Sequence, residues 1–146
     1  MNKIPSFTEY FDDYDNGGQA SIIHTNTDIA FSPNLIASLA LEYLPVKSLR
    51  FTFIAKYVDK QYLDNTMNSN RSLDSYLVSN VEAAYTWRGE LFEEIQLGLQ
   101  LNNIFSELYE NNGYTYSYLY GAKMYTENFY YPQAEFNWMS RLIIKF

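Results

Sequence analysis

Apolar and polar residues alternate along five segments of this chain, with the period of two that is typical of β-strands whose two faces differ. The five segments cover residues 35–44, 49–57, 76–87, 92–103 and 136–146. In the fourth segment the two alternating sets are Ile95, Leu97, Leu99 and Leu101 against Gln96, Gly98, Gln100 and Asn102. Helical periodicity is nearly missing. The pattern therefore predicts an all-β fold, an antiparallel meander in one domain that spans residues 1–146.

The connections between these segments alternate in length. Short turns follow the first and third segments, at 45–48 and 88–90, whereas 59–74 and 103–133 are long. Short turns on one side and long loops on the other are typical of outer-membrane β-barrels, and a soluble sandwich has no reason to sort its loops in this way. Residues 7–31 are irregular and acidic, so we expect them to be the end of an earlier strand followed by an outward loop.

The last segment has the length and the two faces of a membrane-spanning strand. One face carries Phe136, Trp138, Leu142, Ile144 and Phe146, and the other carries Asn137, Arg141 and Lys145, with Met139 and Ile143 between them. Ten steps of about 3.3 Å, tilted by about 40°, rise about 25 Å, the height of the apolar band on membrane barrels. We expect the lipid-facing surface to include Leu39, Leu41, Phe51, Phe53, Leu97 and Leu99.

Composition narrows the class of protein. The chain has 146 residues, enough for one domain, and its 47% hydrophobic content excludes a disordered tail. No run of about 18 apolar residues exists, which rules out a transmembrane helix. The net charge of −7 disfavours nucleic acid as a partner, and cysteine is absent. The 15 tyrosines suit a membrane interface or a sugar-binding surface, because tyrosine has an apolar body and a polar tip.

Several longer motifs resemble a known family. They are Thr27-Asp-Ile-Ala-Phe-Ser-Pro-Asn34, Lys56-Tyr-Val-Asp-Lys-Gln-Tyr-Leu-Asp-Asn-Thr66, Asn102-Asn-Ile-Phe105 with Tyr109, Asn112-Gly-Tyr-Thr-Tyr116, Tyr131-Pro-Gln133 and the terminal Phe146. Together they resemble the C-terminal end of TonB-dependent outer-membrane receptors. The resemblance implies about five to six strands of a larger, 22-stranded barrel in the outer membrane of a Gram-negative cell, which imports an iron chelate, vitamin, glycan or peptide.

The same resemblance implies the partners. Outer-membrane lipid and the barrel-assembly machinery would contact the chain directly, TonB would act only through a plug domain that these residues lack, and a surface lipoprotein is a further candidate. No signal peptide is visible near Met1. We therefore expect a piece of a longer exported protein, with a cytosolic protein as the alternative.

No arrangement of residues predicts an enzyme, a cofactor or a metal site. His24 is the only histidine and lies in a segment that reads as a loop, so a Ser/His/Asp site would need partners that the sequence does not identify. Asp12, Asp13 and Asp15 could offer oxygens to calcium, but their spacing lacks the ligand set of a calcium loop. We expect a solvated acidic loop instead.

Four tyrosines at strand spacing form the most suggestive surface. Tyr114, Tyr116, Tyr118 and Tyr120 could stack on a ligand at the mouth of a receptor, or could form an aromatic girdle at the outer interface. We favour the structural role. The charged residues Lys56, Lys60 and Arg71 lie near Asp59, Asp64 and Asp74, and we expect them to be a charge-balanced loop and rim.

The end of the chain is a candidate assembly signal. Leu142, Ile144 and Phe146 place apolar groups on one face of the closing strand, and this pattern resembles the signal read by the barrel-assembly machinery. Two other readings stay open. In a soluble all-β ligand-binding domain the apolar faces would meet each other, and a small complete barrel would suit the chain's length but not its strand count.

Overall fold

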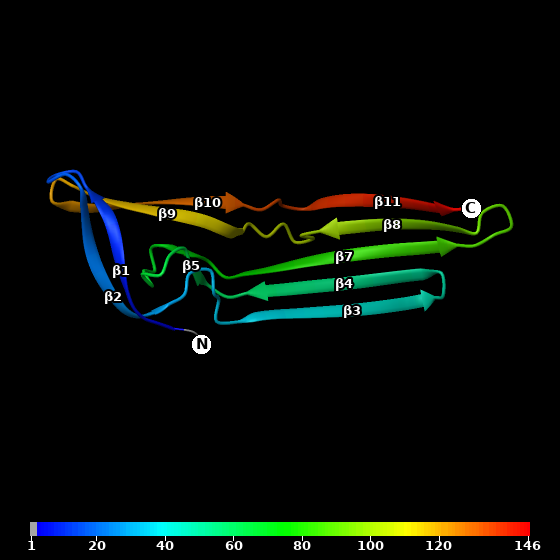
Figure 1. The fold of residues 1–146 in the computed structure, drawn as a ribbon. Helices are drawn as coiled ribbons and strands as arrows, with labels where there is room; N and C mark the ends of the chain where they lie inside the picture. The colour runs from blue at the N-terminus through cyan, green and yellow to red at the C-terminus, as the bar shows by residue number, and fades with distance from the viewer. Residues whose placement is uncertain (1–2) are drawn as a thin grey trace. The chain divides into compact units, whose positions relative to one another are not determined.

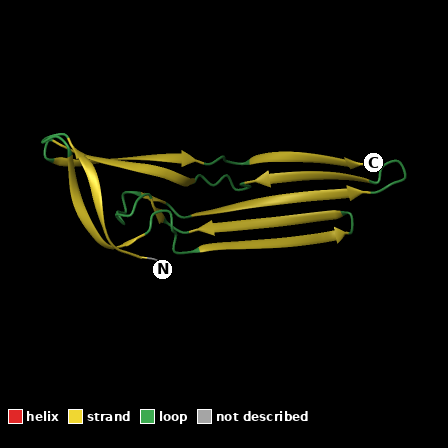
Figure 2. Ribbon diagram, viewed as in Figure 1, coloured by secondary structure: helices red, strands yellow, loops and turns green. Residues whose placement is uncertain are grey.

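The computed structural model describes residues 3–146, and the elements in this range are β-strands, β1 to β11 in chain order (Figures 1 and 2). The chain divides into two compact units, each assembled from three stretches of sequence. Unit 1 comprises residues 3–35, 59–75 and 109–133, and unit 2 comprises residues 36–58, 76–108 and 134–146. The described residues include no helix long and apolar enough to cross a membrane.

Unit 2 is a single antiparallel sheet of five strands that confirms the five segments predicted from alternation. The strands are β3 (Ile36–Val46), β4 (Leu49–Val58), β7 (Tyr76–Trp87), β8 (Glu94–Asn102) and β11 (Asn137–Lys145). Their order across the sheet, β11-β8-β7-β4-β3, follows the order along the unit's chain, which is the predicted meander. Strands β3 and β11 are its two edges.

The strand register gathers the apolar positions of unit 2 on one face of the sheet. Directly paired residues point to the same side, and so a chain of pairs defines a row across the sheet. One row joins Leu41, Phe53, Val81, Leu101 and Trp138. The next rows carry Tyr43, Phe51, Ala83, Leu99 and Ser140, then Leu49, Tyr85, Leu97 and Leu142. We call this surface the apolar face.

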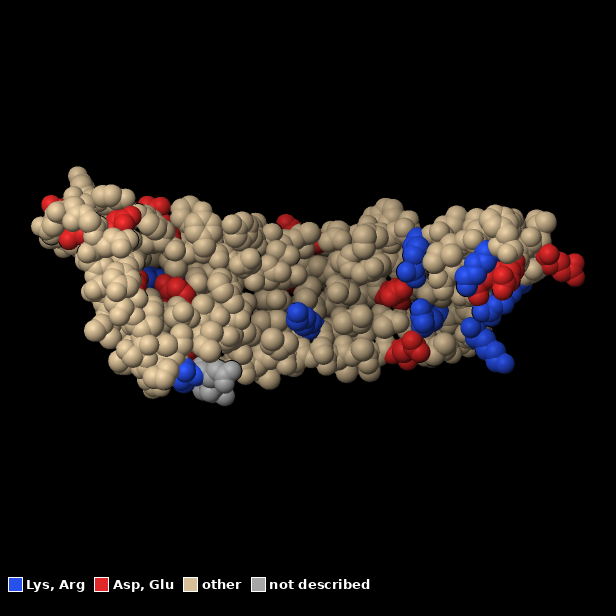
Figure 3. All heavy atoms as spheres, in the orientation of Figure 1, with Lys and Arg blue, Asp and Glu red and all other residues tan. Residues whose placement is uncertain are grey.

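The opposite face of the same sheet is polar. One row joins Glu42, Thr52, Glu82 and Gln100, and the next joins Arg50, Ala84, Gly98 and Arg141. Opposite charges in neighbouring rows approach each other, at 3.9 Å for Arg50–Glu42 and 3.8 Å for Arg141–Glu82. Figure 3 shows positive and negative side chains side by side toward the end of unit 2 that carries the β3–β4 turn.

Unit 1 contains a four-stranded sheet in the order β10-β9-β1-β2. Its strands are β1 (Lys3–Asp13), β2 (Gln19–Asp28), β9 (Glu110–Tyr120) and β10 (Lys123–Pro132). Both hairpins are antiparallel, and β1 joins β9 by a short parallel contact of Asp12 with Tyr118 and Asp13 with Leu119. The short strands β5 (Gln61–Tyr62) and β6 (Ser72–Leu73) pair with each other within residues 59–75.

Residues 7–31 were expected to be the end of a strand followed by an outward loop, and 103–133 a long connection, but these residues contain part of β1 and the whole of β2, β9 and β10. Alternation is hidden there because the inward face of this sheet carries polar groups as well as apolar ones. Phe11 is buried in the same strand as Glu9, whose neighbour across β1 and β2 is Ile22. A polar residue that is paired inside a unit looks in sequence like one that faces water.

Residues 59–75 lie against the inward face of the four-stranded sheet. Leu63 and Leu73 are buried, and Leu73 is the most completely buried side chain of those described. A Cβ on Gly113 would lie 2.6 Å from the backbone oxygen of Phe129 and 3.1 Å from Leu63. The glycine therefore permits β9, β10 and the 59–75 segment to approach closely.

Candidate functional site

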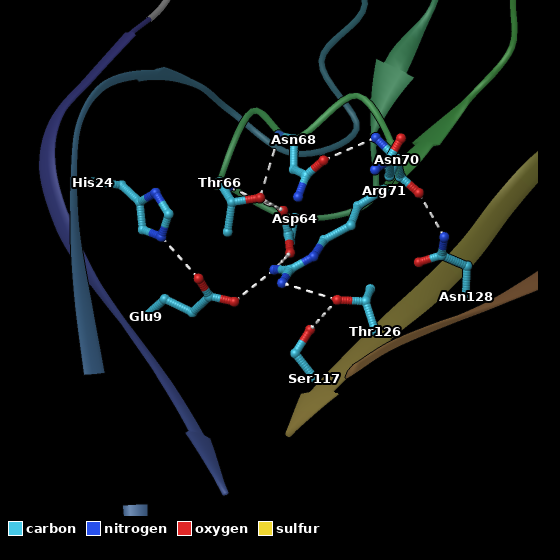
Figure 4. Close-up of polar contacts among 10 residues, drawn as sticks. All are labelled: Glu9, His24, Asp64, Thr66, Asn68, Asn70, Arg71, Ser117, Thr126 and Asn128. Carbon is cyan, nitrogen blue, oxygen red and sulfur yellow. Dashed lines mark hydrogen bonds and ion pairs between the residues drawn. The ribbon is translucent and has the colours of Figure 1, made fainter. Parts of the chain in front are cut away.

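Two surfaces are candidates for function, one in each unit. The first is the apolar face of unit 2, where large side chains such as Leu41, Leu97 and Leu142 are exposed. Soluble monomers rarely leave an apolar patch of this extent uncovered, and larger patches mark interaction or membrane surfaces. The second is a polar cluster in unit 1 centred on Arg71 (Figure 4).

Arg71 is buried, with only 5% of its surface exposed, and connects three segments of unit 1. One guanidinium nitrogen, Nη1, donates to Glu9 Oε1 at 2.5 Å and to Asp64 Oδ2 at 2.8 Å. The other, Nη2, approaches the Thr126 hydroxyl at 3.4 Å. Glu9 lies on β1 and Thr126 on β10, so Arg71 joins the 59–75 segment to both hairpins of the sheet.

The sequence predicted a charge-balanced loop and rim, and Arg71 does pair with Asp64, but it is buried and also pairs with Glu9 of β1. Burial lowers the pKa of Arg71, but hydrogen bonds to Glu9 and Asp64 and the charges of both carboxylates raise it more, so that its pKa lies above the ordinary value. The guanidinium therefore stays charged. A buried cation needs its anions, because removing one partner leaves an uncompensated charge. The cluster consequently fixes where the 59–75 segment lies.

His24 also belongs to this cluster, on β2 and not in a loop. Its Nε2 lies 2.8 Å from Glu9 Oε2, and its ring stacks on Phe7 with 5.1 Å between centroids. Glu9 thus binds His24 through one oxygen and Arg71 through the other. This arrangement orients the two side chains relative to each other and predicts a structural role for His24.

Local hydrogen bonds shape the 59–75 segment around Arg71. The Asp64 carboxylate accepts the backbone N–H and the hydroxyl of Thr66, and the Asn68 side chain accepts the N–H of Asn70. These Asx-type turns need no partner outside the segment. Asn128 of β10 then donates its side-chain amide to the backbone oxygen of Asn70 at 2.6 Å, which adds a second tie between segment and sheet.

A hollow of about 350 Å³ opens where β1 and β9 part beyond their short contact. Glu9 and Phe11 line it from β1, Thr115 and Ser117 from β9, and Arg71 from the 59–75 segment. Its size is at the lower end of the range of about 300–1,000 Å³ typical of ligand sites. The lining offers carboxylates, hydroxyls and a guanidinium, which suits a ligand that both donates and accepts hydrogen bonds.

The four predicted tyrosines share one face of β9. Cross-strand pairing stacks Tyr118 on Tyr125 at 5.4 Å and Tyr114 on Phe129 at 4.7 Å between centroids. The Tyr116 hydroxyl donates to Asp12 Oδ2 at 2.8 Å and lies 3.1 Å from the Tyr14 hydroxyl. Rings that stack on each other stabilise the hairpin. A role in ligand contact stays a prediction.

The pKa of Tyr116 is raised by its hydrogen bonds to Tyr14 and Asp12, and by the negative charge of Asp12. The pKa of Tyr118 is raised by burial and by the Glu127 carboxylate. Both phenols therefore remain neutral donors through the physiological range.

The acidic residues considered for calcium point to different partners. Asp13 accepts from the backbone and side chain of Asn16, and the side-chain hydrogen bond is the main cause that lowers the pKa of Asp13. Asp15 accepts the backbone N–H groups of Gly121 and Ala122 at 2.7 and 2.6 Å. Within residues 3–146, no three His, Cys, Asp or Glu side chains converge as metal ligands.

The candidate assembly residues follow the strand register. Leu142 and Ile144 lie on the apolar face, opposite Leu97 and Ile95. Phe146 follows the end of β11 and contacts the Phe92 ring edge-on at 5.5 Å. Their role in assembly stays a prediction.

Asn103 is a structural residue that the sequence did not single out beyond its motif. It is 3% exposed and has a positive φ of 48°. Its side chain makes three hydrogen bonds to backbone groups of Glu107 and Ala134. Asparagine is among the few residues that adopt this backbone conformation readily. The residue type was therefore the one sequence signal that could have indicated a tight turn here.

No protein-family model matches this chain, and a search of the curated proteins finds no match either.

Proposed function

We propose that unit 2 is part of the wall of an outer-membrane β-barrel and that the chain belongs to a receptor that imports a bulky nutrient. One observation carries the proposal: the continuous, exposed apolar face of a one-layer antiparallel sheet whose other face is polar. In water this face would be uncovered on every strand from β3 to β11. In a membrane, lipid acyl chains would cover the apolar face, and the polar face would then line the lumen.

The dimensions of unit 2 support this proposal. Its strands have 9 to 12 residues. Transmembrane strands need about 9–11 residues when tilted by about 45°. Shorter strands could not cross the hydrocarbon layer, and the sheet of a small soluble domain has no need for such uniform lengths.

The edges of the sheet also support a larger barrel. Strands β3 and β11 each have one neighbour among the described residues. Backbone groups without partners cannot remain in lipid, so a membrane sheet must close. We infer that further strands of the same receptor pair with β3 and β11. The substrate class rests on the resemblance to TonB-dependent receptors, and coupled import would require their plug domain.

Adjacent residues on opposite faces provide the sharpest test. Leu99 lies on the apolar face and Gln100 on the polar face of β8. In the complete receptor barrel folded into phosphatidylcholine vesicles, Leu99→Arg should lower the free energy of unfolding by about 2–4 kcal/mol, because the charge enters the lipid layer. Gln100→Arg should change it by less than about 1 kcal/mol, because the side chain stays in a wet lumen. Denaturant titration measures both values.

The alternative is a soluble all-β ligand-binding domain. It requires that another apolar surface cover the apolar face. In that case Leu99→Arg would strongly lower the free energy of unfolding in plain buffer. A reversible, monomeric unfolding transition without detergent would favour this alternative and contradict the membrane proposal. Aggregation in buffer, reversed by detergent, is what the exposed sheet predicts.

A further inference from the structure

The loop that follows β8, residues 103–108, is held by several hydrogen bonds, and two large apolar side chains of the loop are exposed. Asn103 donates its side-chain amide to the backbone oxygens of Glu107 and Ala134, at 2.9 and 3.1 Å. Its side-chain oxygen accepts the N–H of Glu107 at 2.9 Å. Phe105 and Leu108 are nevertheless 73% and 76% exposed.

Two residues of this loop have a left-handed backbone conformation. Asn103 and Ser106 have positive φ angles of 48° and 52°. The Ser106 N–H donates to the Asn103 carbonyl at 2.9 Å, which closes a tight turn around Ile104 and Phe105. Asparagine adopts this region readily, whereas serine adopts it at a cost that the surrounding contacts must offset. Phe105 is therefore in a turn whose two ends are held by hydrogen bonds.

The loop lies beside the apolar face of unit 2. The Ser106 hydroxyl accepts the N–H of Phe136 at 3.3 Å, which places the loop beside the start of β11. Trp138, two residues further along, is 62% exposed and is paired with Leu101 in a row of the apolar face. Phe136, which Ser106 of the loop contacts, is itself 48% exposed and lies two residues before Trp138.

A second group of exposed apolar residues lies at the other end of the same strands. Leu91 precedes β8, and Phe146 follows β11. Trp138 and Phe146 are separated by eight steps of about 3.3 Å along a strand, and a tilt of about 40° reduces this to a height of about 20 Å. Aromatic residues at two levels separated in this way are typical of the two interfaces of a membrane.

We propose that loop 103–108 is a preformed anchor at the membrane interface, with Phe105 and Leu108 inserted at the boundary between lipid headgroups and acyl chains. This inference rests on the proposed lipid-facing role of unit 2. A loop already held by hydrogen bonds suits this task, because ordering an unstructured loop would cost conformational entropy on insertion. Its occupant is lipid and not a partner protein, because the loop lies beside a surface that would already be in lipid.

Fluorescence quenching in vesicles tests the anchor. The chain has only two tryptophans, so a background with Trp87→Phe and Trp138→Phe has none. Phe105→Trp is added to this background, and the complete receptor barrel, with any tryptophan of its other strands also replaced by Phe, is folded into phosphatidylcholine vesicles that carry bromine either near the headgroup or deep in the acyl chain. We expect F105W fluorescence to be lost with shallow bromine and mostly retained with deep bromine. L108W provides a second reporter if F105W folds poorly.

Two control reporters distinguish a failure of the anchor proposal from a failure of the membrane-wall proposal. Trp138 alone, in the Trp87→Phe variant, reports on the apolar face, and Thr52→Trp in the tryptophan-free background reports on the polar face. Quenching of Trp138 without quenching of F105W and L108W would overturn the anchor and leave the membrane wall intact. If bromine at neither depth quenches Trp138, the membrane wall itself is overturned, and the anchor with it.

Discussion

Arg71 and Glu9 are 62 positions apart in the sequence, and their side chains meet at 2.5 Å inside unit 1. This contact joins the 59–75 segment to β1, and Asp64 completes it from within the segment. Glu9 also binds His24 of β2 through its second oxygen. Arg71 and Glu9 together therefore link three stretches of chain: the 59–75 segment, β1 and β2.

Replacement of Arg71 should destabilise unit 1. Arg71→Met retains the length of the side chain but leaves the Glu9 and Asp64 carboxylates without their cation, so we expect a loss of about 3 kcal/mol. Native-state hydrogen exchange of residues 59–75 measures this loss locally. Arg88→Met is the matched control, because the Arg88 side chain is 73% exposed in its pair with Glu94, and such surface pairs contribute about 0–1 kcal/mol. Equal protection of residues 59–75 in wild type and R71M would contradict the role of Arg71.

Asn103→Asp should destabilise the loop after β8, although the two side chains have the same shape. Aspartate can still accept the N–H of Glu107, but it cannot donate to the carbonyls of Glu107 and Ala134 and places a negative charge against them. We expect a loss of about 2–4 kcal/mol in the free energy of unfolding. Asn112→Asp is the control, because Asn112 is exposed and accepts only through its oxygen, which aspartate retains. Similar losses for both variants would mean that the added charge, not the lost donors, is responsible.

The turn between β9 and β10 should be stabilised by Ala122→Gly. Gly121 and Ala122 have φ angles of +60° and +56°, the two positive values of a type I′ hairpin turn. Only glycine adopts them without a steric cost, so we expect a gain of about 0.5–1 kcal/mol by thermal denaturation. Ala37→Gly in the exposed strand β3 should instead lose about 0.5–1 kcal/mol, because the backbone there is extended. A loss at both positions would show that chain entropy outweighs the relief of strain at the turn.

Asp15→Ala should weaken the contact between the two hairpin turns of unit 1. Asp15 accepts the N–H groups of Gly121 and Ala122, so the substitution removes both hydrogen bonds. We expect a loss of about 1 kcal/mol and faster amide exchange at both donors. Unchanged exchange at Gly121 and Ala122 would contradict this contact.

Tyr116 should ionise later than an ordinary tyrosine. Hydrogen bonds to Tyr14 and Asp12 raise its pKa in the folded protein, so the neutral phenol is favoured there. The stability from this contact is complete below the unfolded pKa of about 10 and is lost as the pH rises above it. Spectrophotometric titration of tyrosinate measures the effect, and Tyr116→Phe should remove one late-titrating group. Asp12→Asn should shift that group to lower pH, and a titration identical to wild type in both variants would rule out this assignment.

The features that could be predicted from the sequence are those that depend only on neighbouring residues. The strand that contains Leu97 and Leu99 could be predicted with its two faces, because successive side chains of a strand point to opposite sides whatever the strand pairs with. The same holds for the tyrosines from Tyr114 to Tyr120, which share a face at every second position. The roles of Arg71 and His24 could not be predicted in this way, since their partners lie far away in sequence and no periodicity marks them.

The sequence by itself determined the all-β class, the five strands of unit 2 and the composition of their two faces, because a period of two needs only neighbouring residues. The tertiary structure alone decided that β1, β2, β9 and β10 form a second sheet and that Arg71 is buried between Glu9 and Asp64. It also decided that the loop held by Asn103 leaves the Phe105 side chain exposed. The physical reason is the same in each case. A polar side chain can be buried only when another segment supplies its partner, and that segment is brought near by the fold and not by the sequence.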